Sequence, residues 1–247
     1  MDQDQLLAAT ARAEAHHFWF HGFRGFVSPL LSRAVRHLPA PGILDCGCGT
    51  GHNLALLRKY GRAVGIDLTA SGLAYATRRG ERSVAQASAV ALPFGSASFD
   101  VVTSFDVLQT LDDEAERTAL SEMYRVMRPG GHLVINVAAL ALLTGNHSIL
   151  AREVRRYNAT MLADRLRAAG FAIRQLSYTN ATITPLVGAV RLLQRIQGHR
   201  ESAHEIAIPS PLVNTALAAV LGVEAAVLRV VNMPFGSSLL ALAQRPG

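Results

Sequence analysis

Short apolar runs alternate along the chain with longer stretches of helical pattern. The apolar runs predict strands over residues 43–45, 63–67, 84–87, 99–105, 132–138, 171–178 and 238–244. The helical pattern predicts helices over residues 52–60, 71–79, 112–127 and 157–169, and residues 128–131 predict a sharp turn. Strands that alternate with helices are typical of a doubly wound, mostly parallel α/β sheet, in which ligands bind at the carboxyl ends of the strands.

Two helical segments lie outside this alternation. Residues 6–37 predict helix around an aromatic run at 16–20, and the prolines and glycine of 39–42 end it. Residues 183–231 predict a long apolar helical insertion ahead of the last strand. The chain therefore divides into a helical lid segment (1–41), a core (42–180), a helical insertion (181–234) and a last core strand (235–247).

The most apolar part of the insertion, residues 212–231, is long enough to cross a bilayer. It contains Asn214, Glu224 and Arg229, and charged groups at membrane depth are costly. We therefore expect a buried or interface helix pair here rather than a transmembrane span.

The composition indicates which kinds of partner and which cellular compartment to expect. The 247 residues are 50% hydrophobic and 17% charged, which suits one elaborated α/β domain. The net charge of +6 comes from scattered arginines rather than a basic stripe with interleaved aromatics, so we expect no nucleic-acid partner. The acidic, polar N-terminus lacks the features of a signal peptide, and the chain has only two cysteines. We therefore expect a cytoplasmic location.

A glycine-rich loop carries the first candidate chemistry. Strand 43–45 leads into Asp45-Cys46-Gly47-Cys48-Gly49-Thr50-Gly51, and a helix follows. Glycine tolerates positive φ and lets a ligand approach the backbone. The Gly-x-Gly-x-Gly spacing differs from the dinucleotide fingerprint, and no lysine follows as in a phosphate-binding P-loop. Asp45, two residues before the first glycine, suits a ligand with a positive amino group.

Asp67 and the two cysteines complete this region. Asp67 ends the next strand, sixteen residues after Gly51, where an acid can accept hydrogen bonds from both hydroxyls of a ribose. A turn or helix cap is the alternative, and the glycine loop upstream favours the ribose. Cys46 and Cys48 are too close for an unstrained disulfide and have no further metal ligands at a workable spacing. We expect them to be small spacers, with no metal bound.

Five ordered motifs resemble those of the class I S-adenosylmethionine-dependent methyltransferases, and most closely the methyltransferase type 11 group. They occupy residues 43–51, 64–67, 91–102, 105–109 and 125–131. The resemblance implies a Rossmann-like, seven-stranded sheet whose last strand, near 238–244, is antiparallel. It implies S-adenosyl-L-methionine as the cofactor.

The resemblance also implies roles for individual residues. The methionine part of the cofactor lies against Asp45, Gly47, Cys48, Gly49 and Gly51. Asp67 holds the ribose, and the adenine contacts Leu68, Ser88 and Ala89, whereas Phe105 and Asp106 lie beside the methyl donor. The family usually has an acid where this chain has Ser88, so that contact is weaker here, and often has histidine where this chain has Thr110.

Candidate acceptor residues lie on both sides of the core motifs. Trp19 and Phe20 either close over the cofactor as part of a lid or pack a helix onto the core. Arg155, Arg156 and Tyr157 follow the fifth strand, where acceptor pockets often form in this fold. His147 in the same segment is a candidate base for an acceptor hydroxyl, and a surface histidine is the alternative.

The sequence therefore predicts methyl transfer to a small metabolite, including apolar or lipid-like ones. We favour oxygen or carbon over nitrogen acceptors, because residues 104–107 lack the Asn/Asp-Pro-Pro-Tyr/Phe signature of many amino-directed enzymes. A non-catalytic cofactor-binding scaffold is the main alternative. The glycine spacing and Asp45 argue against a nicotinamide-dependent oxidoreductase. The apolar insertion suits an acceptor pocket, a homodimer face or a membrane-surface contact.

Overall fold

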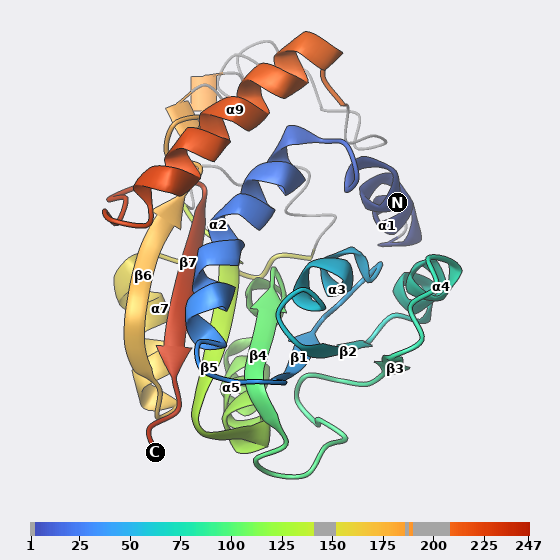
Figure 1. The fold of residues 1–247 in the computed structure, drawn as a ribbon, viewed down its shortest axis with the longest axis vertical. Helices are drawn as coiled ribbons and strands as arrows, with labels where there is room; N and C mark the ends of the chain where they lie inside the picture. Colours follow the sequence, from blue (N-terminus) through green and yellow to red (C-terminus); the bar gives the residue numbers. More distant parts are fainter. Residues whose placement is uncertain (1–2, 141–151, 186–187, 190–207) are drawn as a thin grey trace.

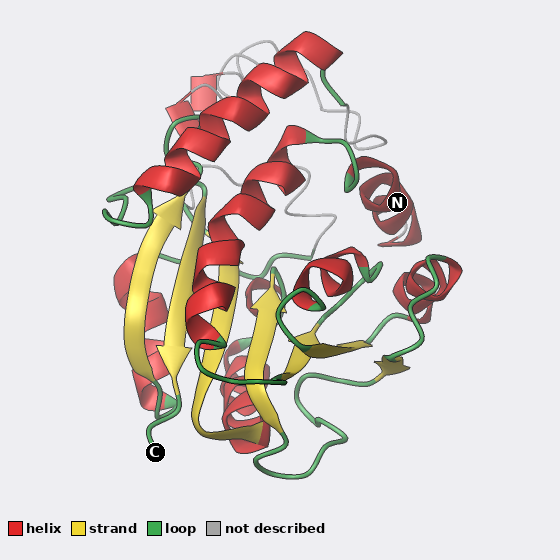
Figure 2. Cartoon of the chain, viewed as in Figure 1, coloured by secondary structure: helices red, strands yellow, loops and turns green. Residues whose placement is uncertain are grey.

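The computed structural model describes residues 3–140, 152–185, 188–189 and 208–247. A seven-stranded sheet forms its centre, with the strand order β3-β2-β1-β4-β5-β7-β6 (Figures 1 and 2). All neighbouring strands are parallel except β7, which is antiparallel to both β5 and β6. The predicted sheet and its antiparallel last strand are thereby confirmed. The strands are β1 (Gly42–Cys46), β2 (Arg62–Asp67), β3 (Val84–Gln86), β4 (Phe99–Phe105), β5 (Met127–Ala138), β6 (Ala172–Thr179) and β7 (Ser238–Gln244).

Helices cover both faces of the sheet and enclose two hydrophobic cores. One core packs the helices α5 (Asp113–Val126) and α7 (Ala159–Ala168) against one face. The other packs α2 (Phe18–Ala34), α3 (His52–Leu57) and α9 (Pro211–Val227) against the opposite face (Figure 1). Neighbouring strand residues such as Ile43 and Leu44 belong to different cores, as expected for buried strands whose side chains alternate between faces. The other helices that can be bounded among the described residues are α1 (Gln3–Ala13), α4 (Ala70–Arg78) and the short 3-10 helix η1 (Leu108–Thr110).

Two predicted helices have different boundaries because polar side chains cap the helix starts. The single helix expected over residues 6–37 is two helices, α1 and α2, since the His17 ring accepts a hydrogen bond from the Trp19 amide at the start of α2. The helix expected from residue 157 begins only at Ala159, because the Asn158 side chain accepts from the Met161 amide. Tyr157 therefore lies before the helix and not in it.

Residues 128–131 lie in the irregular first part of β5, where the backbone turns within the strand. The pairing of β4 with β5 shifts register between Phe99 and Val101. Gly130 has a φ of +80°, and its backbone exchanges hydrogen bonds with Arg245 and Gln244 at the end of β7. The pairing of β5 with β7 begins only at His132, so the turn predicted at residues 128–131 falls inside β5, between Met127 and the stretch that pairs with β7.

The described part of the apolar insertion packs against the N-terminal helices. Residues 212–231 contain one helix, α9, rather than a pair, and α9 lies along α2 (Figure 1). A Cβ at Gly22 would overlap the Leu221 side chain, so the two helices approach closely at this point. Within the described ranges, no helix is long and apolar enough to cross a membrane.

The polar residues of the insertion hold this packing in place. Glu224 is only 1% exposed, and its carboxylate accepts from the Ala181 amide and from the amide and hydroxyl of Thr182. Asn214 accepts from the Phe18 amide and donates to the His16 carbonyl at the α1–α2 junction. The charge inside the apolar stretch therefore caps a turn after β6, which accounts for its presence there.

Candidate functional site

The glycine loop between β1 and α3 has a left-handed backbone at three positions. Gly47, Gly49 and Gly51 have φ values of +84°, +51° and +74°. A Cβ at Gly47 would overlap Val107, and one at Gly51 would lie 2.8 Å from the Ala76 Cβ, so packing excludes side chains at both positions. Gly49 has no atom within 4 Å of its Cβ position. The backbone at Gly49 therefore faces open space, where a ligand can approach it.

Asp45 lies beneath this loop with one carboxylate oxygen unsatisfied. The residue is 1% exposed, and its Oδ1 accepts from the Thr103 hydroxyl at 2.7 Å. Its Oδ2 is buried and has no hydrogen-bond partner among the described residues. Burial raises the pKa of Asp45 to about 7, and the negative charge of Asp67 adds to this increase. Buried acceptors without a partner are rare, and a ligand ammonium group would supply the missing donor.

Asp67 fixes the position of the loop, a role that the sequence interpretation missed. Its Oδ2 accepts from the Gly49 amide at 2.8 Å, and its Oδ1 accepts from the amide and hydroxyl of Thr69. The carboxylate thus links β2, the glycine loop and the start of α4. Thr69, two residues further on, was the available signal, because Asp often bonds to the backbone at that spacing. A carboxylate has about four acceptor sites, so these bonds leave capacity for a ribose hydroxyl.

Leu68 follows the end of β2, and Ser88 and Ala89 follow the end of the neighbouring strand β3. The Leu68 side chain is 68% exposed, which is unusual for a leucine at the end of a buried strand. The Gln86 side chain donates to the Leu68 carbonyl at 2.9 Å and joins the two strand ends. The Ser88 hydroxyl accepts only a long bond, 3.3 Å, from the Val90 amide. An exposed apolar side chain beside polar groups of this kind suits a flat heterocycle.

Cys48 contributes to the loop through its backbone alone. The side chain is 7% exposed and packs where a Gly65 side chain would otherwise lie. Cys46 is fully buried, and burial raises the pKa of both thiols above the usual value. Both cysteines are free, as expected for small spacers. In the described part of the chain, no cluster of three or more His, Cys, Asp or Glu side chains could hold a metal ion.

The end of β4 presents Phe105 and Asp106. The Phe105 ring packs edge-on against Phe23 of α2, with ring centroids 5.0 Å apart. Asp106 has a φ of +60°, a strained conformation for a residue other than glycine. Its Oδ1 accepts from the side chains of Gln109 and Asn136, at 3.1 and 3.0 Å. Strain of this kind is concentrated at functional sites.

The surroundings of Asp106 shift its acidity. Desolvation by the surrounding chain raises the pKa of Asp106 to about 6, although the side chain reaches solvent, and the bonds from Gln109 and Asn136 oppose the increase. Asn136 was missed in the sequence, where the signal was a single amide in the apolar strand 132–138. Glu153 and Arg156 form an ion pair, and the negative charge of Glu153 raises the pKa of Asp106 while the positive charge of Arg156 lowers it.

We call the helices α1, α2 and α9 the cover, and the N-terminal part of this cover is bonded directly to the glycine loop. Glu14, which follows α1 and is 8% exposed, accepts from the Thr50 hydroxyl at 2.6 Å and pairs with Arg79 at 3.2 Å. Trp19 and Phe20, in the first turn of α2, are half-buried, and Trp19 packs on the core shared by α2 and α9. Packing of α2 onto the core does not prevent Trp19 and Phe20 from belonging to a lid, so the two interpretations of the aromatic run are compatible. No local pattern in the sequence pointed to Glu14.

The acceptor residues predicted after β5 do not gather at the loop. The Arg155 guanidinium pairs with the fully buried Glu116 and with Asp113, both of α5. Tyr157 is 2% exposed and belongs to the core beneath α5 and α7. Of this group only Arg156 lies near Asp106, where it donates to the Ala139 carbonyl at the end of β5. His147 lies outside the described residues.

Comparison with known proteins gives one family-model match and several relatives. A family model described as a methyltransferase domain matches residues 44–135. A probable S-adenosylmethionine-dependent methyltransferase of Mycolicibacterium smegmatis is 32% identical over 135 residues, 53% of this chain and 52% of that protein. The malonyl-(acyl-carrier protein) O-methyltransferase of Herminiimonas arsenicoxydans is 30% identical over 181 residues, 69% of this chain and 68% of that protein. The chain thus spans about half of the first relative and two thirds of the second.

Solved structures share the fold. An S-adenosylmethionine-dependent methyltransferase from Mesorhizobium loti matches with a TM-score of 0.58 and 18% identity, over 89% of this chain and 97% of that one. Phosphoethanolamine N-methyltransferase 2 of Haemonchus contortus, in complex with S-adenosyl-L-methionine, matches with a TM-score of 0.57 and 20% identity, over 89% of this chain and 52% of that one. At these identities the likeness concerns the fold alone.

Proposed function

Because this chain belongs to the class I S-adenosylmethionine-dependent methyltransferase family, we propose that it transfers a methyl group from that cofactor to a small acceptor. The observation that carries the proposal is the pairing of the orphaned Asp45 Oδ2 with the open backbone at Gly49. The buried acceptor lies near the end of β1, and the open backbone lies four residues further on in the loop. This combination suits the amino acid part of the cofactor.

The remaining residues of the site fit the other parts of the cofactor. The Asp45 carboxylate would accept from the ammonium group, and the free amides at the start of α3 lie next in the loop. Asp67 keeps acceptor capacity for the ribose hydroxyls. Leu68 would cover one face of the adenine, with Ser88 and Ala89 at its edge. These assignments satisfy each unusual feature of the site: the orphaned oxygen, the open glycine and the exposed leucine.

Bound S-adenosylmethionine supplies a methyl group that is already activated by its sulfonium. The protein must therefore align the acceptor and exclude water. The Phe23–Phe105 pair provides an apolar wall at the end of β4. Asp106, with a pKa of about 6, is mostly ionised at neutral pH and can accept a proton from an acceptor hydroxyl. His147 stays a second candidate for this role.

The acceptor class follows from the relatives and from the site. An O-methyltransferase of Penicillium expansum is 33% identical over 172 residues, 61% of this chain and 60% of that protein. We favour oxygen or carbon acceptors over nitrogen, because residues 104–107 lack the Asn/Asp-Pro-Pro-Tyr/Phe signature of many amino-directed enzymes. We propose a small, apolar or lipid-like acceptor, because α9 and the Phe23–Phe105 wall are apolar. Trp19, Phe20 and Arg156 are the described side chains proposed to line its path.

Contacts beyond the acceptor stay predictions. The outward face of α9 is apolar and exposes the side chains of Leu212, Val213, Val220, Val223 and Val227. This face is the proposed contact with a second copy or a membrane surface. A cytoplasmic location and the lack of a nucleic-acid partner are proposed on the composition alone.

The decisive experiment compares cofactor binding in two glycine variants. Gly49→Arg places a side chain in the open space of the loop, and we expect calorimetry to show S-adenosylmethionine affinity falling at least about 100-fold. Gly130→Arg is the matched control, since Gly130 also has a positive φ and open space around its Cβ position but lies at the far end of the sheet. Its affinity should equal that of the unaltered protein. The proposal would be refuted if the unaltered chain did not bind the cofactor even at millimolar concentration.

A second measurement separates an enzyme from a binding scaffold. The chain is incubated with methyl-labelled cofactor and fractionated metabolites, and the label is followed by mass spectrometry. We expect label in at least one small, apolar product with the unaltered chain and none with Gly49→Arg. Tight cofactor binding without transfer to any fraction would favour the scaffold.

A further inference from the structure

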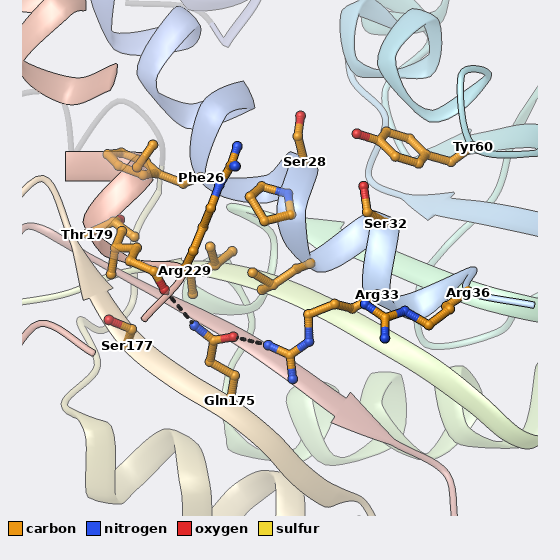
Figure 3. A pocket seen from close by; sticks show the side chains of 15 residues that line it. Phe26, Ser28, Ser32, Arg33, Arg36, Tyr60, Gln175, Ser177, Thr179 and Arg229 are labelled. Atoms are coloured by element: carbon orange, nitrogen blue, oxygen red, sulfur yellow. Dashed lines mark hydrogen bonds between the residues drawn. The ribbon is translucent and has the colours of Figure 1, made fainter. Parts of the chain in front are cut away.

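A second hollow lies on the molecule, outside the cofactor site. It has a volume of 430 Å³ and opens between α2, the strands β6 and β7, and the end of α9 (Figure 3). None of the residues assigned above to the cofactor or to the acceptor lines it. Its volume falls within the range of small-molecule sites.

The floor of this pocket is apolar. Phe26 and Leu30 come from α2, Leu240 comes from β7, and Leu228 ends α9. All four side chains are at least nine-tenths buried, so the floor is already ordered in the unbound protein. An aliphatic or aromatic group placed there would lose little further entropy from the protein.

The walls of the pocket are cationic. Arg33 and Arg36 extend into it from the end of α2, and Arg229 extends from the end of α9 (Figure 3). No acidic residue is among the fifteen that line the pocket. Arg33 bonds to the neutral amide of Gln175, and within the described residues none of the three arginines forms an ion pair.

Some arginines of the described surface, such as Arg58 and Arg125, pair with a carboxylate, and others, such as Arg117 and Arg174, do not. What distinguishes Arg33, Arg36 and Arg229 is that they line one hollow without an acidic residue. Three unpaired guanidinium groups around one hollow create a positive potential that attracts anions. The Ser32 side chain lies along the same wall and adds a hydroxyl donor, whereas the Ser28 hydroxyl donates to the Arg24 carbonyl at 2.6 Å (Figure 3).

We propose that this pocket binds a small amphipathic anion, with a carboxylate or phosphate head on the cationic wall to which Arg33, Arg36 and Arg229 contribute. The apolar body of the ligand lies on Phe26, Leu30, Leu228 and Leu240. Guanidinium groups suit such heads because they donate parallel hydrogen bonds to two oxygens. The site lies on α2, which also carries Phe23 against Phe105, so a ligand here would steady the helix that covers the proposed acceptor site.

The ligand class is tested with four simple probes on the full chain. Octyl phosphate and octanoate carry both the head and the body, octanol lacks the charge, and inorganic phosphate lacks the apolar body. We expect saturable binding of at least one of the two anions in calorimetry, at least about tenfold tighter than octanol or inorganic phosphate. The stronger of the two identifies the head group. Equal binding of octanol, or no saturable binding of either anion, would overturn the proposal.

Substitutions in the pocket test whether the preferred anion binds there. The double substitution Arg33→Gln with Arg229→Gln should weaken binding of the preferred anion at least about tenfold, and Ser32→Asp should weaken it by charge repulsion. Arg174→Gln is the control, since Arg174 is an exposed arginine of β6 that bonds to Gln244 outside the pocket. S-adenosylhomocysteine binding, measured on every variant, should stay unchanged and show that the fold is intact. Unaltered anion binding in the double variant would refute the assignment.

Discussion

The glycine-loop end of the molecule and the helical cover above it are built from different kinds of contact. In the loop, Asp67 reaches Gly49 eighteen residues away and Thr69 two residues away. In the cover, Phe18 bonds to Asn214 across 196 residues of chain, and Ala181 bonds to Glu224 across 43. The loop is therefore specified by a short segment of sequence, whereas the cover exists only once distant segments have packed.

One buried acid in each region makes the contrast sharper. Asp45 and Glu224 are each 1% exposed. Glu224 accepts three hydrogen bonds from the turn after β6, but Asp45 accepts one and leaves Oδ2 without a described partner. The three bonds of Glu224 stabilise the fold, whereas the orphaned oxygen of Asp45 lacks a donor that a bound ligand can supply. Substitutions at the two positions should therefore separate ligand affinity from stability.

The largest effect is expected at Asp45, on affinity. Asp45→Asn keeps an acceptor for Thr103 but removes the charge that faces the proposed ammonium group. We expect S-adenosylmethionine affinity to fall about 100-fold, since hydrogen bonds to charged groups contribute about 1.5–3 kcal/mol. Asp164→Asn, at an exposed position of α7, is the control for loss of one negative charge. If calorimetry shows that the two variants bind S-adenosylmethionine with affinities within a factor of two, Asp45 does not contribute to the binding site.

The next effect is on stability, at Glu224. Glu224→Ala leaves the donors of Ala181 and Thr182 without their acceptor. Thr182 is exposed and can bond to water, but the Ala181 amide is buried, and a stranded buried donor costs about 1–3 kcal/mol. We expect the free energy of unfolding in urea to fall by about 2–3 kcal/mol, with cofactor affinity nearly unchanged. Glu114→Ala, at an exposed site in the first turn of α5, should cost less than about 1 kcal/mol. Equal losses in the two variants would contradict the role of Glu224 as a cap.

The same difference explains what could be predicted from the sequence. All seven strands and the glycine loop follow from local patterns, because alternation and glycine spacing are properties of short segments. The antiparallel direction of β7 does not follow from such a pattern and was implied only by the family resemblance. The bond between Glu14 and Thr50 could not be predicted, since nothing near either residue indicates the other. The Arg155-Arg156-Tyr157 run shows the converse limit. Its position after β5 suggested an acceptor pocket, but only the fold shows that Arg155 turns toward Glu116.

A smaller effect concerns the pH dependence of stability. Because the folded pKa of Asp45 is about 7 and the unfolded value is near 4, the unfolded state releases this proton first. The residue therefore lowers the stability of the unbound protein progressively as pH rises from about 4 to 7. Asp45→Asn should be more stable than the unaltered chain at pH 8 by about 1–2 kcal/mol, and this advantage should shrink at pH 5. Urea unfolding at both pH values measures it, and an advantage that does not depend on pH would contradict the assignment.

The smallest effect is expected where the two regions meet, at the bond from Thr50 to Glu14. Thr50→Val removes the hydroxyl while keeping the shape of the side chain, and Glu14 retains its ion pair with Arg79. Burial raises the pKa of Glu14 and the Thr50 bond opposes that increase, so the variant should loosen the cover without unfolding the loop. The variant loses one hydrogen bond to the Glu14 carboxylate, which is still stabilised by Arg79. We therefore expect a loss of about 1 kcal/mol of binding free energy, which lowers cofactor affinity roughly fivefold.

The matched control for this last variant is Thr77→Val. Thr77 lies on α4 and is exposed, and its hydroxyl donates to the Leu73 carbonyl within the same helix. Affinity for S-adenosylhomocysteine is measured by calorimetry, and the single tryptophan, Trp19 at the start of α2, reports on the cover by fluorescence. We expect Thr50→Val to change both signals and Thr77→Val to change neither. If affinity falls while the Trp19 signal stays constant, Thr50 acts on the loop alone and the cover is not coupled to it through Glu14.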